Sequence, residues 1–228
     1  MKPLALITGV GPGTGSSIAR RFAAAGYRTA LLARDAARIN ALASELPDSL
    51  ALPCDVTDAQ ALATAVQAAG PAEVVVHNAV GGAWGTFRDI DPAVLERNFQ
   101  TNVMALLHLA RLTTPSMLEA GRGALIVTGN TSALRGRARF AGFAPTKAAQ
   151  RILAESMARD LGPQGIHVAY LVIDAVIDVP WARQTHADKP DDFFIQPDAI
   201  ANEVFHLVQQ ERSAWSFYAE VRPFHEVW

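Results

Sequence analysis

The sequence of 228 residues contains a single cysteine, Cys54, so no internal disulfide can form. A lone cysteine is typical of a reducing compartment, and we expect a cytoplasmic location. No apolar run approaches the roughly 18 residues that a membrane-spanning helix needs. The formal net charge is only −2, and no signature of a nucleic-acid-binding module is present. These absences predict a protein that takes neither a membrane nor a nucleic acid as its partner.

Tyrosine is also scarce, and the three present, Tyr27, Tyr170 and Tyr218, fall in segments expected to be core or closing strands. None of them can be assigned a catalytic role from its position. His77 has no second ligand-type residue at metal-binding spacing, so we predict no metal site. Its place at the end of an apolar run favours a packed histidine over a catalytic base.

Glycine, in contrast, clusters near the start of the chain, where an apolar run at 4–8 leads through a loop into a helical pattern that ends near Gly26. Without a Cβ atom, glycine lets the backbone approach a pyrophosphate, whose charge a helix N-terminus favours. The loop residues expected at a diphosphate are Gly9, Gly11, Gly13, Thr14 and Gly15. The alternative is a strand-to-helix turn that binds nothing.

Strand-like and helical segments alternate along the whole chain with short connections. Strands are predicted at 4–8, 28–33, 49–54, 73–77, 123–128, 166–172 and 216–221. Helices are predicted from the glycine loop to Gly26, at 35–46, from Asp58 onward, at 91–113 with Pro115 closing it, at 143–161 and at 196–210. This order predicts one α/β domain over 1–228, a single Rossmann-type, doubly wound parallel sheet flanked by helices on both faces.

With Thr8 in front, the glycine spacing resembles the Thr-Gly-x-x-x-Gly-x-Gly signature of the short-chain dehydrogenase/reductase family. Further landmarks follow in that family's order over nearly the whole chain, including Asp55-Val56 and Asn78. The resemblance implies that Asp55 holds the adenine amino group, that Val56 lines the adenine pocket and that Asn78 lies near the adenine ribose. The alternative for Asp55 is a turn residue.

Arg34 directly follows the second predicted strand, where dinucleotide folds place either an acid for the ribose hydroxyls or a cation for a 2′-phosphate. A guanidinium pairs with phosphate through two hydrogen bonds, which favours NADP(H) over NAD(H) as the cofactor. The rival interpretation gives the ribose to Asp35. That residue opens a helical segment and is more simply explained as its N-cap.

Asn102, within the long helix predicted to begin at Asp91, is similar to the family's helix asparagine, which holds a water linked to the catalytic lysine. Asparagine is an unfavourable choice in a helix interior, so a functional role is favoured for it. Asn98, one turn earlier, is the competing candidate.

Family members carry Tyr-x-x-x-Lys at the start of the sixth helix, with a serine thirteen residues before the tyrosine. Lys147 matches the lysine, but Phe143 stands at the tyrosine position and Asn130 at the serine position. The resemblance implies that Lys147 binds the nicotinamide ribose, and an Asn130 amide can donate to an oxyanion. The missing proton donor could be Thr131, Ser132, the substrate or water.

The sixth predicted strand runs into Asp174-Ala175, where relatives have Pro-Gly, and Val179 replaces their threonine. Ile177 matches by position a residue whose backbone meets the nicotinamide carboxamide. The polar, aromatic-tipped segment 180–194 is predicted to be irregular, either a lid over the substrate or a solvated loop. The aromatic-rich end, 213–228, is expected at a subunit interface.

The sequence therefore predicts an NADP(H)-dependent oxidoreductase whose substrate is a small carbonyl, alcohol or activated alkene, with Lys147, Asn102 and Asn130 as its catalytic residues. The alternative is a dinucleotide-binding sensor or subunit without turnover. The resemblance also implies a homodimer or homotetramer. Three alternating arginines, at 135, 137 and 139, could meet a phosphate-bearing substrate or form a solvated basic loop.

Overall fold

The computed structural model describes residues 2–226, and its main sheet holds seven parallel strands in the order β3-β2-β1-β4-β5-β6-β9. These strands are β1 (Leu4–Thr8), β2 (Arg28–Ala33), β3 (Ser49–Pro53), β4 (Val74–His77), β5 (Gly123–Asn130), β6 (Ile166–Ile173) and β9 (Tyr218–Val221). A separate parallel pair joins β7 (Val176–Ile177) to β8 (Phe194–Ile195). The chain order reverses between β1 and β4, and such switch points are where doubly wound sheets bind ligands.

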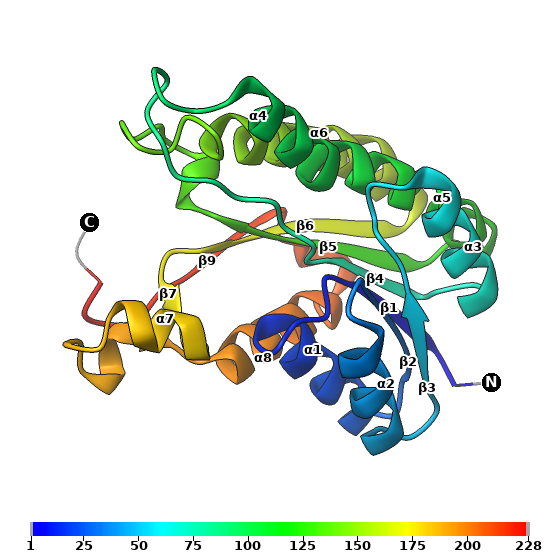
Figure 1. The fold of residues 1–228 in the computed structure, drawn as a ribbon. Coiled ribbons are helices and arrows are strands. Elements are labelled where there is room, and N and C mark those ends of the chain that lie inside the picture. The colour runs from blue at the N-terminus through cyan, green and yellow to red at the C-terminus, as the bar shows by residue number, and fades with distance from the viewer. Residues whose placement is uncertain (1, 227–228) are drawn as a thin grey trace.

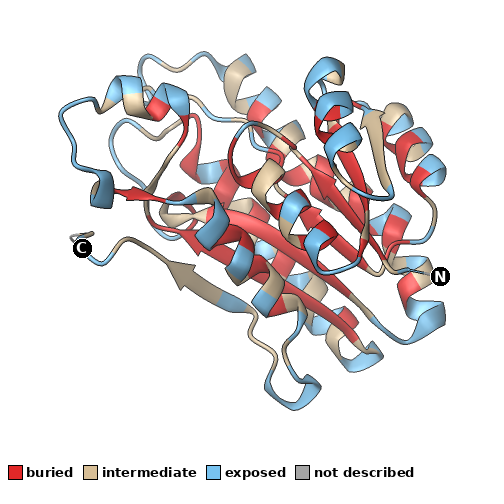
Figure 2. Cartoon of the chain, turned by 90° about the horizontal axis from the view of Figure 1, so that it is seen from below, coloured by how far each residue is buried: buried red, intermediate tan, exposed pale blue. Residues whose placement is uncertain are grey.

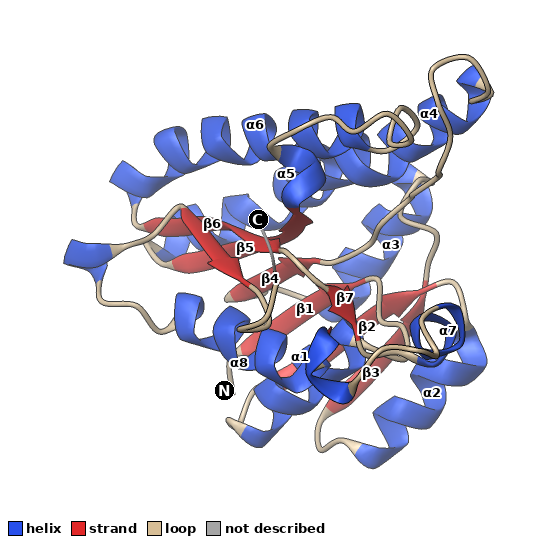
Figure 3. Ribbon diagram, turned by 90° about the vertical axis from the view of Figure 1, so that its left-hand side faces the viewer, coloured by secondary structure: helices blue, strands red, loops and turns tan. Residues whose placement is uncertain are grey.

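Helices cover both faces of this sheet (Figure 1; Figure 3). One face carries α1 (Thr14–Ala24), α2 (Ala36–Glu45) and α8 (Pro197–Val208). The other carries α3 (Ala59–Ala69), α4 (Pro92–Phe99), α5 (Ala105–Ala120) and α6 (Ala144–Leu161). The short helix α7 (Pro180–Thr185) lies between β7 and β8 in the chain. The predicted α/β class, with helices on both faces of a parallel sheet, is confirmed.

The central strands are buried on both sides because alternate residues enter two separate apolar clusters (Figure 2). In β1, Leu6 packs on the side of α3, α5 and α6, whereas Ile7 packs on the side of α1, α2 and α8. Both side chains are fully buried. This double burial explains why the strands are nearly continuous apolar runs with little polar alternation.

The prediction that Pro115 closes the fourth helix is wrong. The chain continues from α4 through a π-helical turn, Gln100–Met104, into α5, which runs to Ala120 with Pro115 inside it. Met117, beyond the proline, is 1% exposed. We attribute the continuation to that burial, because it offsets the one backbone hydrogen bond that proline cannot donate.

The prediction of an irregular segment over 180–194 is also wrong, because α7 and the start of β8 lie within it. Near the C-terminus, Trp215 stacks on His167 of the same chain, with 4.8 Å between ring centroids. The interface expected for 213–228 therefore includes a tryptophan already packed on its own chain, and residues 227–228 lie outside the described part. No helix within 2–226 is long and apolar enough to cross a bilayer.

Candidate active site

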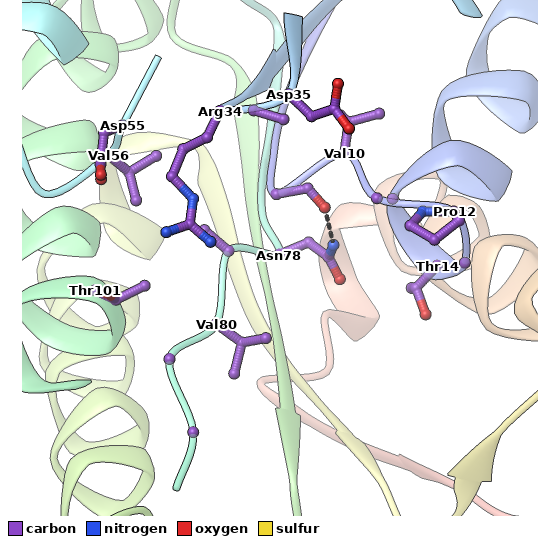
Figure 4. Close-up of a pocket in the computed structure, with 18 of the residues that line it drawn as sticks. Val10, Pro12, Thr14, Arg34, Asp35, Asp55, Val56, Asn78, Val80 and Thr101 are labelled. Carbon is purple, nitrogen blue, oxygen red and sulfur yellow. Dashed lines mark hydrogen bonds between the residues drawn. The ribbon is translucent and has the colours of Figure 1, made fainter. Parts of the chain in front are cut away.

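A cleft of about 970 Å³ opens at the carboxyl ends of β1, β2 and β4 (Figure 4). It is bounded by the glycine loop, the ends of β2 and β3, the loop after β4, the start of the π-helical turn and the segment after β6. Of the residues predicted to bind a cofactor, it gathers Gly9, Gly11, Gly13, Thr14, Gly15, Arg34, Asp55, Val56, Asn78 and Ile177. Lys147 is the predicted cofactor contact that does not line it.

The glycine loop closes tightly on the end of β4. Gly9 has a φ of +71°, and a Cβ atom there would lie 2.5 Å from the backbone of Ala79. A Cβ on Gly15 would lie 2.5 Å from the Gly9 carbonyl oxygen, whereas one on Gly11 would meet nothing within 4 Å. The first and last of these glycines therefore permit close packing, and Gly11 leaves room on the open side.

The start of α1 has the free donors that a diphosphate needs. Its N-cap, Gly13, has no side chain to satisfy the first amide groups of the helix. The hydroxyl of Thr14 is buried, lines the cleft and has no hydrogen-bond partner within residues 2–226. A buried donor without a partner is costly unless a ligand satisfies it. These residues fit the diphosphate of a dinucleotide.

Asn78 fixes the position of this loop. Its Nδ2 donates to the Gly9 carbonyl oxygen at 2.8 Å, and its Oδ1 accepts from the Thr128 hydroxyl at 3.0 Å. The dashed line in Figure 4 marks the first of these bonds. The amide is therefore engaged by the protein on both sides, and Asn78 positions the loop that would contact a cofactor.

At the end of β2, Arg34 extends into the cleft toward the side where Asp55 and Val56 lie (Figure 4). Its guanidinium makes no ion pair or hydrogen bond with any residue in the described range 2–226. Asp35 instead accepts a hydrogen bond from the Arg38 amide at 3.0 Å and forms an ion pair with the Arg38 side chain. The N-cap interpretation of Asp35 is confirmed. The Arg34 guanidinium, in contrast, is not occupied by any such contact within the described residues.

Asp55 is held by the residue two positions later. Its Oδ1 accepts from the Thr57 amide at 3.0 Å and from the Thr57 hydroxyl at 2.8 Å. The backbone hydrogen bond from Thr57, with smaller help from the Arg34 charge, lowers the pKa of the Asp55 carboxyl. Both interpretations of Asp55 find support here, since it is a turn residue that also lines the cleft.

Lys147, the predicted centre of the chemistry, is 2% exposed and points inward. Its Nζ donates to the Thr128 carbonyl oxygen at 3.1 Å and to Gln150 Oε1 at 2.5 Å. Burial lowers the pKa of this amine to about 7. A neutral amine keeps two N–H donors, which is enough for these two acceptors, so the arrangement does not require the charge.

Gln150 is a site residue that the sequence reasoning missed. Besides accepting from Lys147, it donates through Nε2 to the Asn102 carbonyl oxygen at 2.7 Å, and Tyr170 donates to its Oε1 at 3.3 Å. It lies one helical turn after Lys147 on the same inner face of α6 and is fully buried. That i, i+3 spacing of a buried amide behind the lysine is the signal that could have found it.

Asn102 ties three elements together. Its Nδ2 donates to the Gly81 carbonyl oxygen and to the Thr146 hydroxyl, each at 2.8 Å, and its Oδ1 accepts from the Gly81 amide. The competing candidate, Asn98, donates to the Gly142 carbonyl oxygen at 2.7 Å. Both asparagines thus hold loops around the site, and Asn102 is linked to Lys147 through Gln150.

Phe143, at the position of the family's tyrosine, is 7% exposed and lies in an aromatic cluster. Its ring centroid is 6.2 Å from that of Trp84, which in turn packs edge-on against Phe140 at 4.5 Å. A Cβ on Gly82 would touch the Phe143 ring at 3.6 Å. The ring position is therefore occupied and packed, and it offers no hydroxyl.

Asn130 lines a second, smaller cavity of about 280 Å³ together with Thr131 and Ser132. Its Oδ1 accepts a hydrogen bond from the Ser132 amide at 3.2 Å, which fixes the orientation of the side-chain amide. The structure therefore separates the predicted site residues into three groups: those at the large cleft, Asn130 at the second cavity, and Lys147 with Asn102 in the wall.

His77 lies beneath the glycine loop, 3.2 Å from the Thr8 hydroxyl through Nδ1. Complete burial lowers its pKa to about 3, so the ring is neutral at ordinary pH. This geometry agrees with the prediction of a packed histidine. Within residues 2–226 no group of three or more His, Cys, Asp or Glu side chains is arranged to hold a metal ion.

The segment after β6 packs on the glycine loop, because a Cβ on Gly13 would lie 2.5 Å from the Val179 side chain. An ion-pair cluster holds this segment together. Arg183 pairs with Asp178 through two bonds of 2.6 and 2.7 Å and with Asp191 at 2.5 Å, and its guanidinium lies 4.1 Å from the ring centroid of Phe194. The segment borders the cleft through Ile177, Val179 and Trp181, and its assignment as a lid stays a prediction.

Comparison with known proteins agrees with this architecture. A family model described as short chain dehydrogenase matches residues 3–189. The chain is 34% identical over 165 residues to D-erythrulose reductase of Gallus gallus, covering 72% of this chain and 67% of the relative. It is 28% identical over 222 residues to carbonyl reductase (NADPH) 2 of Sus scrofa, covering 92% and 90% respectively.

Among solved structures, a metagenomic short-chain oxidoreductase in complex with NADP matches with a TM-score of 0.84 and 26% identity, covering 97% of both chains. The family match spans far more than half of the chain, and it joins a fold and a cleft of the same kind. This chain belongs to the short-chain dehydrogenase/reductase family, whose NAD(P)-dependent oxidoreductases act on carbonyl or alcohol substrates.

Proposed function

We propose that this chain is an NADP(H)-dependent oxidoreductase that interconverts a carbonyl compound and its alcohol without a catalytic tyrosine. The observation that carries the proposal is the pairing of an open diphosphate loop with an unengaged Arg34 in one cleft. A guanidinium that makes no ion pair or hydrogen bond within residues 2–226, beside the expected ribose position, suits a 2′-phosphate. The NADP-bound structure and the NADPH-named relative described above support the same preference.

The proposed cofactor contacts divide along the cleft. The glycine loop and the Thr14 hydroxyl bind the diphosphate, Arg34 binds the 2′-phosphate, and Asp55 with Val56 holds the adenine. The backbone of Ile177 meets the carboxamide. For Lys147 to bind the ribose hydroxyls, its amine would exchange the Gln150 acceptor for a ribose oxygen, which leaves the number of its hydrogen bonds unchanged.

When bound, the nicotinamide supplies or accepts a hydride at its ring. Reduction of a carbonyl adds that hydride to carbon and one proton to oxygen, so the protein must stabilise the oxygen and deliver the proton. The Asn130 amide, oriented by the Ser132 amide, is the proposed hydrogen-bond donor to the oxygen. The proton then comes from a hydroxyl beside it, Thr131 or Ser132, or from water.

A second candidate function, nucleotide binding without turnover, is favoured by two observations. Phe143 is packed in an aromatic cluster, and the Lys147 amine is engaged by buried acceptors and does not line the cleft. General acid help is worth about 10²- to 10⁴-fold, so its loss could leave a protein that binds a cofactor and reacts too slowly to matter.

One assay separates the two functions. NADPH absorbance is followed with the native chain across a panel of ketones, quinones and enones, alongside Lys147→Ala and the control Lys2→Ala, an exposed lysine outside both cavities. We expect turnover by the native chain and the control, and its loss in Lys147→Ala. Tight NADPH binding with no oxidation of NADPH in the presence of any of these substrates would support the second function. Turnover that survives Lys147→Ala would overturn the proposed role of the lysine.

A further inference from the structure

The second cavity has features that the proposed chemistry does not use. It is enclosed by the loop after β4, the loop after β5 and the end of β6. Trp84, Phe140 and Phe193 form its apolar walls, and its volume of about 280 Å³ lies near the lower end for small-molecule pockets. An occupant must therefore be small, with a short carbon skeleton that can lie against aromatic rings.

Two cations stand at the mouth of this cavity. Arg135 and Arg137 both line it, both are exposed, and neither forms an ion pair or hydrogen bond through its guanidinium within the described residues 2–226. Arg139, in the same loop, lines neither cavity. Two acids also line the cavity, the half-buried Glu226 and the buried Asp174, so the positive charge is concentrated at the exposed arginines. Unpaired guanidinium groups at a small cavity favour an anionic ligand.

The buried end of this second cavity carries a negative charge instead of positive ones. Asp174 lines the cavity at 6% exposure, and its carboxylate accepts no hydrogen bond from any residue of the described chain. Asn130, at the end of β5, lines the same cavity. With its Oδ1 occupied by the Ser132 amide, the Asn130 amide nitrogen is the group available to donate to a ligand. One acceptor and one donor therefore meet at this end.

We propose that this cavity binds a small substrate with an anionic group, held at the mouth by Arg135 and Arg137, and with a hydroxyl next to its reactive carbon, accepted by Asp174. The inference deepens the proposed oxidoreductase function and rests on it. The charges set the orientation, because Asp174 repels an anion from the inner end and the arginines attract it to the mouth. The reactive carbonyl oxygen then lies at Asn130.

The test uses matched hydroxy ketones that share a carbon skeleton and end in a carboxylate, a phosphate or a neutral hydroxyl. We expect a lower KM for an anionic member than for the neutral one. The double variant Arg135→Gln/Arg137→Gln should raise the KM for the anionic substrates about 5- to 30-fold and leave the neutral one within about twofold. Arg139→Gln should change neither. Equal KM values for neutral and anionic substrates in the native chain would overturn the inference.

The role of Asp174 is tested with a second pair of substrates, a hydroxy ketone and the same ketone without the hydroxyl. Asp174→Asn keeps the shape of the side chain but replaces one acceptor oxygen with an amide donor. We expect it to reduce the preference for the hydroxylated substrate at least about tenfold, since a hydrogen bond to a charged acceptor is lost. An unchanged preference would remove Asp174 from the substrate site.

A binding measurement keeps this inference separate from the proposed function. Hydroxy acids and hydroxyalkyl phosphates, which have no carbonyl to reduce, are titrated against the chain with tryptophan fluorescence as the signal and Trp84→Phe as its control. Arginine-dependent binding without turnover of any ketone would retain the cavity assignment and overturn the oxidoreductase proposal. Turnover of ketones without any preference for an anion would retain the oxidoreductase and overturn the cavity assignment. The ligand series that binds more tightly, hydroxy acids or hydroxyalkyl phosphates, identifies the anionic group as carboxylate or phosphate.

Discussion

The two sides of the switch point treat their polar groups in opposite ways. On the side of β1 to β3, donors stay open within residues 2–226: neither the Thr14 hydroxyl nor the Arg34 guanidinium makes a hydrogen bond, and α1 begins without a side-chain cap. On the side of β5 and β6, Lys147 and Gln150 satisfy each other and the Asn102 carbonyl oxygen. The cleft is prepared for a ligand, whereas the hydrogen-bond network around Lys147 is complete without one.

The difference follows from how each side is built. The cleft depends on backbone geometry, such as the positive φ of Gly9 and the close contact of Gly15, and many side-chain changes leave it intact. Proton transfer depends on single atoms, and phenylalanine at position 143 lacks the hydroxyl of the family's tyrosine while its ring still packs. Binding can therefore persist in a chain whose catalytic groups have changed.

The largest expected effect comes from restoring the hydroxyl at position 143, which tests whether the catalytic groups limit the activity. Phe143→Tyr places a phenol one helical turn from Lys147, whose charged form would lower the phenol pKa. We expect the rate of NADPH-dependent ketone reduction to rise by about 10²- to 10⁴-fold. The control is Phe87→Tyr, which adds a hydroxyl to an 80% exposed ring in the loop after β4. A rate that does not change would show that the inward lysine limits the chemistry whatever residue 143 is.

The backbone side can be tested with two glycines that differ in their surroundings. Gly9→Ala forces a Cβ to within 2.5 Å of Ala79 backbone at a positive φ, and we expect the free energy of unfolding to fall by about 2–5 kcal/mol. Gly11→Ala points into open space and should leave stability nearly unchanged. Denaturant unfolding of both variants gives the comparison. Similar losses in the two would mean that close packing on β4 does not govern the loop.

The preference for a phosphorylated cofactor should depend on one side chain. We expect Arg34→Gln to raise the Kd for NADPH about 10- to 100-fold, because a charge-assisted bidentate contact is lost, and to change the Kd for NADH far less. Arg28→Gln, at the other end of the same strand, is the matched control. If both cofactors weaken equally, the arginine contacts something other than the 2′-phosphate.

The buried lysine makes stability depend on pH. Its pKa falls from 10.5 to about 7 on folding, so between these values the unfolded chain binds more protons than the folded one. The free energy of unfolding should therefore rise with pH across this window by an amount on the order of a few kcal/mol. Lys147→Met should flatten that rise, whereas Lys189→Met should not. Urea unfolding at several pH values measures it, and an unchanged slope in Lys147→Met would contradict the inward placement.

Much of the architecture could be predicted because the signals are local. Doubly buried strands read as apolar runs, and the glycine spacing marks the loop that follows β1. Pro115 misled the prediction because the burial of Met117, a tertiary effect, outweighs the local preference of proline. That residues 1–228 form a single domain, and that the chain forms a homodimer or homotetramer, both stay predictions.

The site was predicted unevenly for a related reason. Positions of cleft residues follow from chain order, but the direction of a long side chain depends on its partners. Lys147 turns inward because Gln150 and the Thr128 carbonyl oxygen accept from it; the i, i+3 spacing hints at the first contact, but a backbone carbonyl leaves no signal in the sequence. Gly129 shows the same limit, because its missing Cβ is explained only by the Tyr170 ring on the neighbouring strand.

The smallest expected effect concerns the segment 178–196, which borders the cleft through Val179 and Trp181. Arg183 lowers the pKa of Asp178 to about 2, so this stabilisation is present above the usual carboxyl pKa of 3.8 and is lost as pH falls toward 2. Because the pair is near the surface, Arg183→Gln should change global stability by less than about 1 kcal/mol.

Arg183→Gln should nevertheless speed amide hydrogen exchange across 178–196 at neutral pH, where the ion pair is intact in the native chain. Arg159→Gln, which removes a surface ion pair on α6, is the control and should leave exchange in that segment unchanged. If amide hydrogen exchange across 178–196 is as fast in the native chain as in Arg183→Gln, this segment opens without breaking the ion pair.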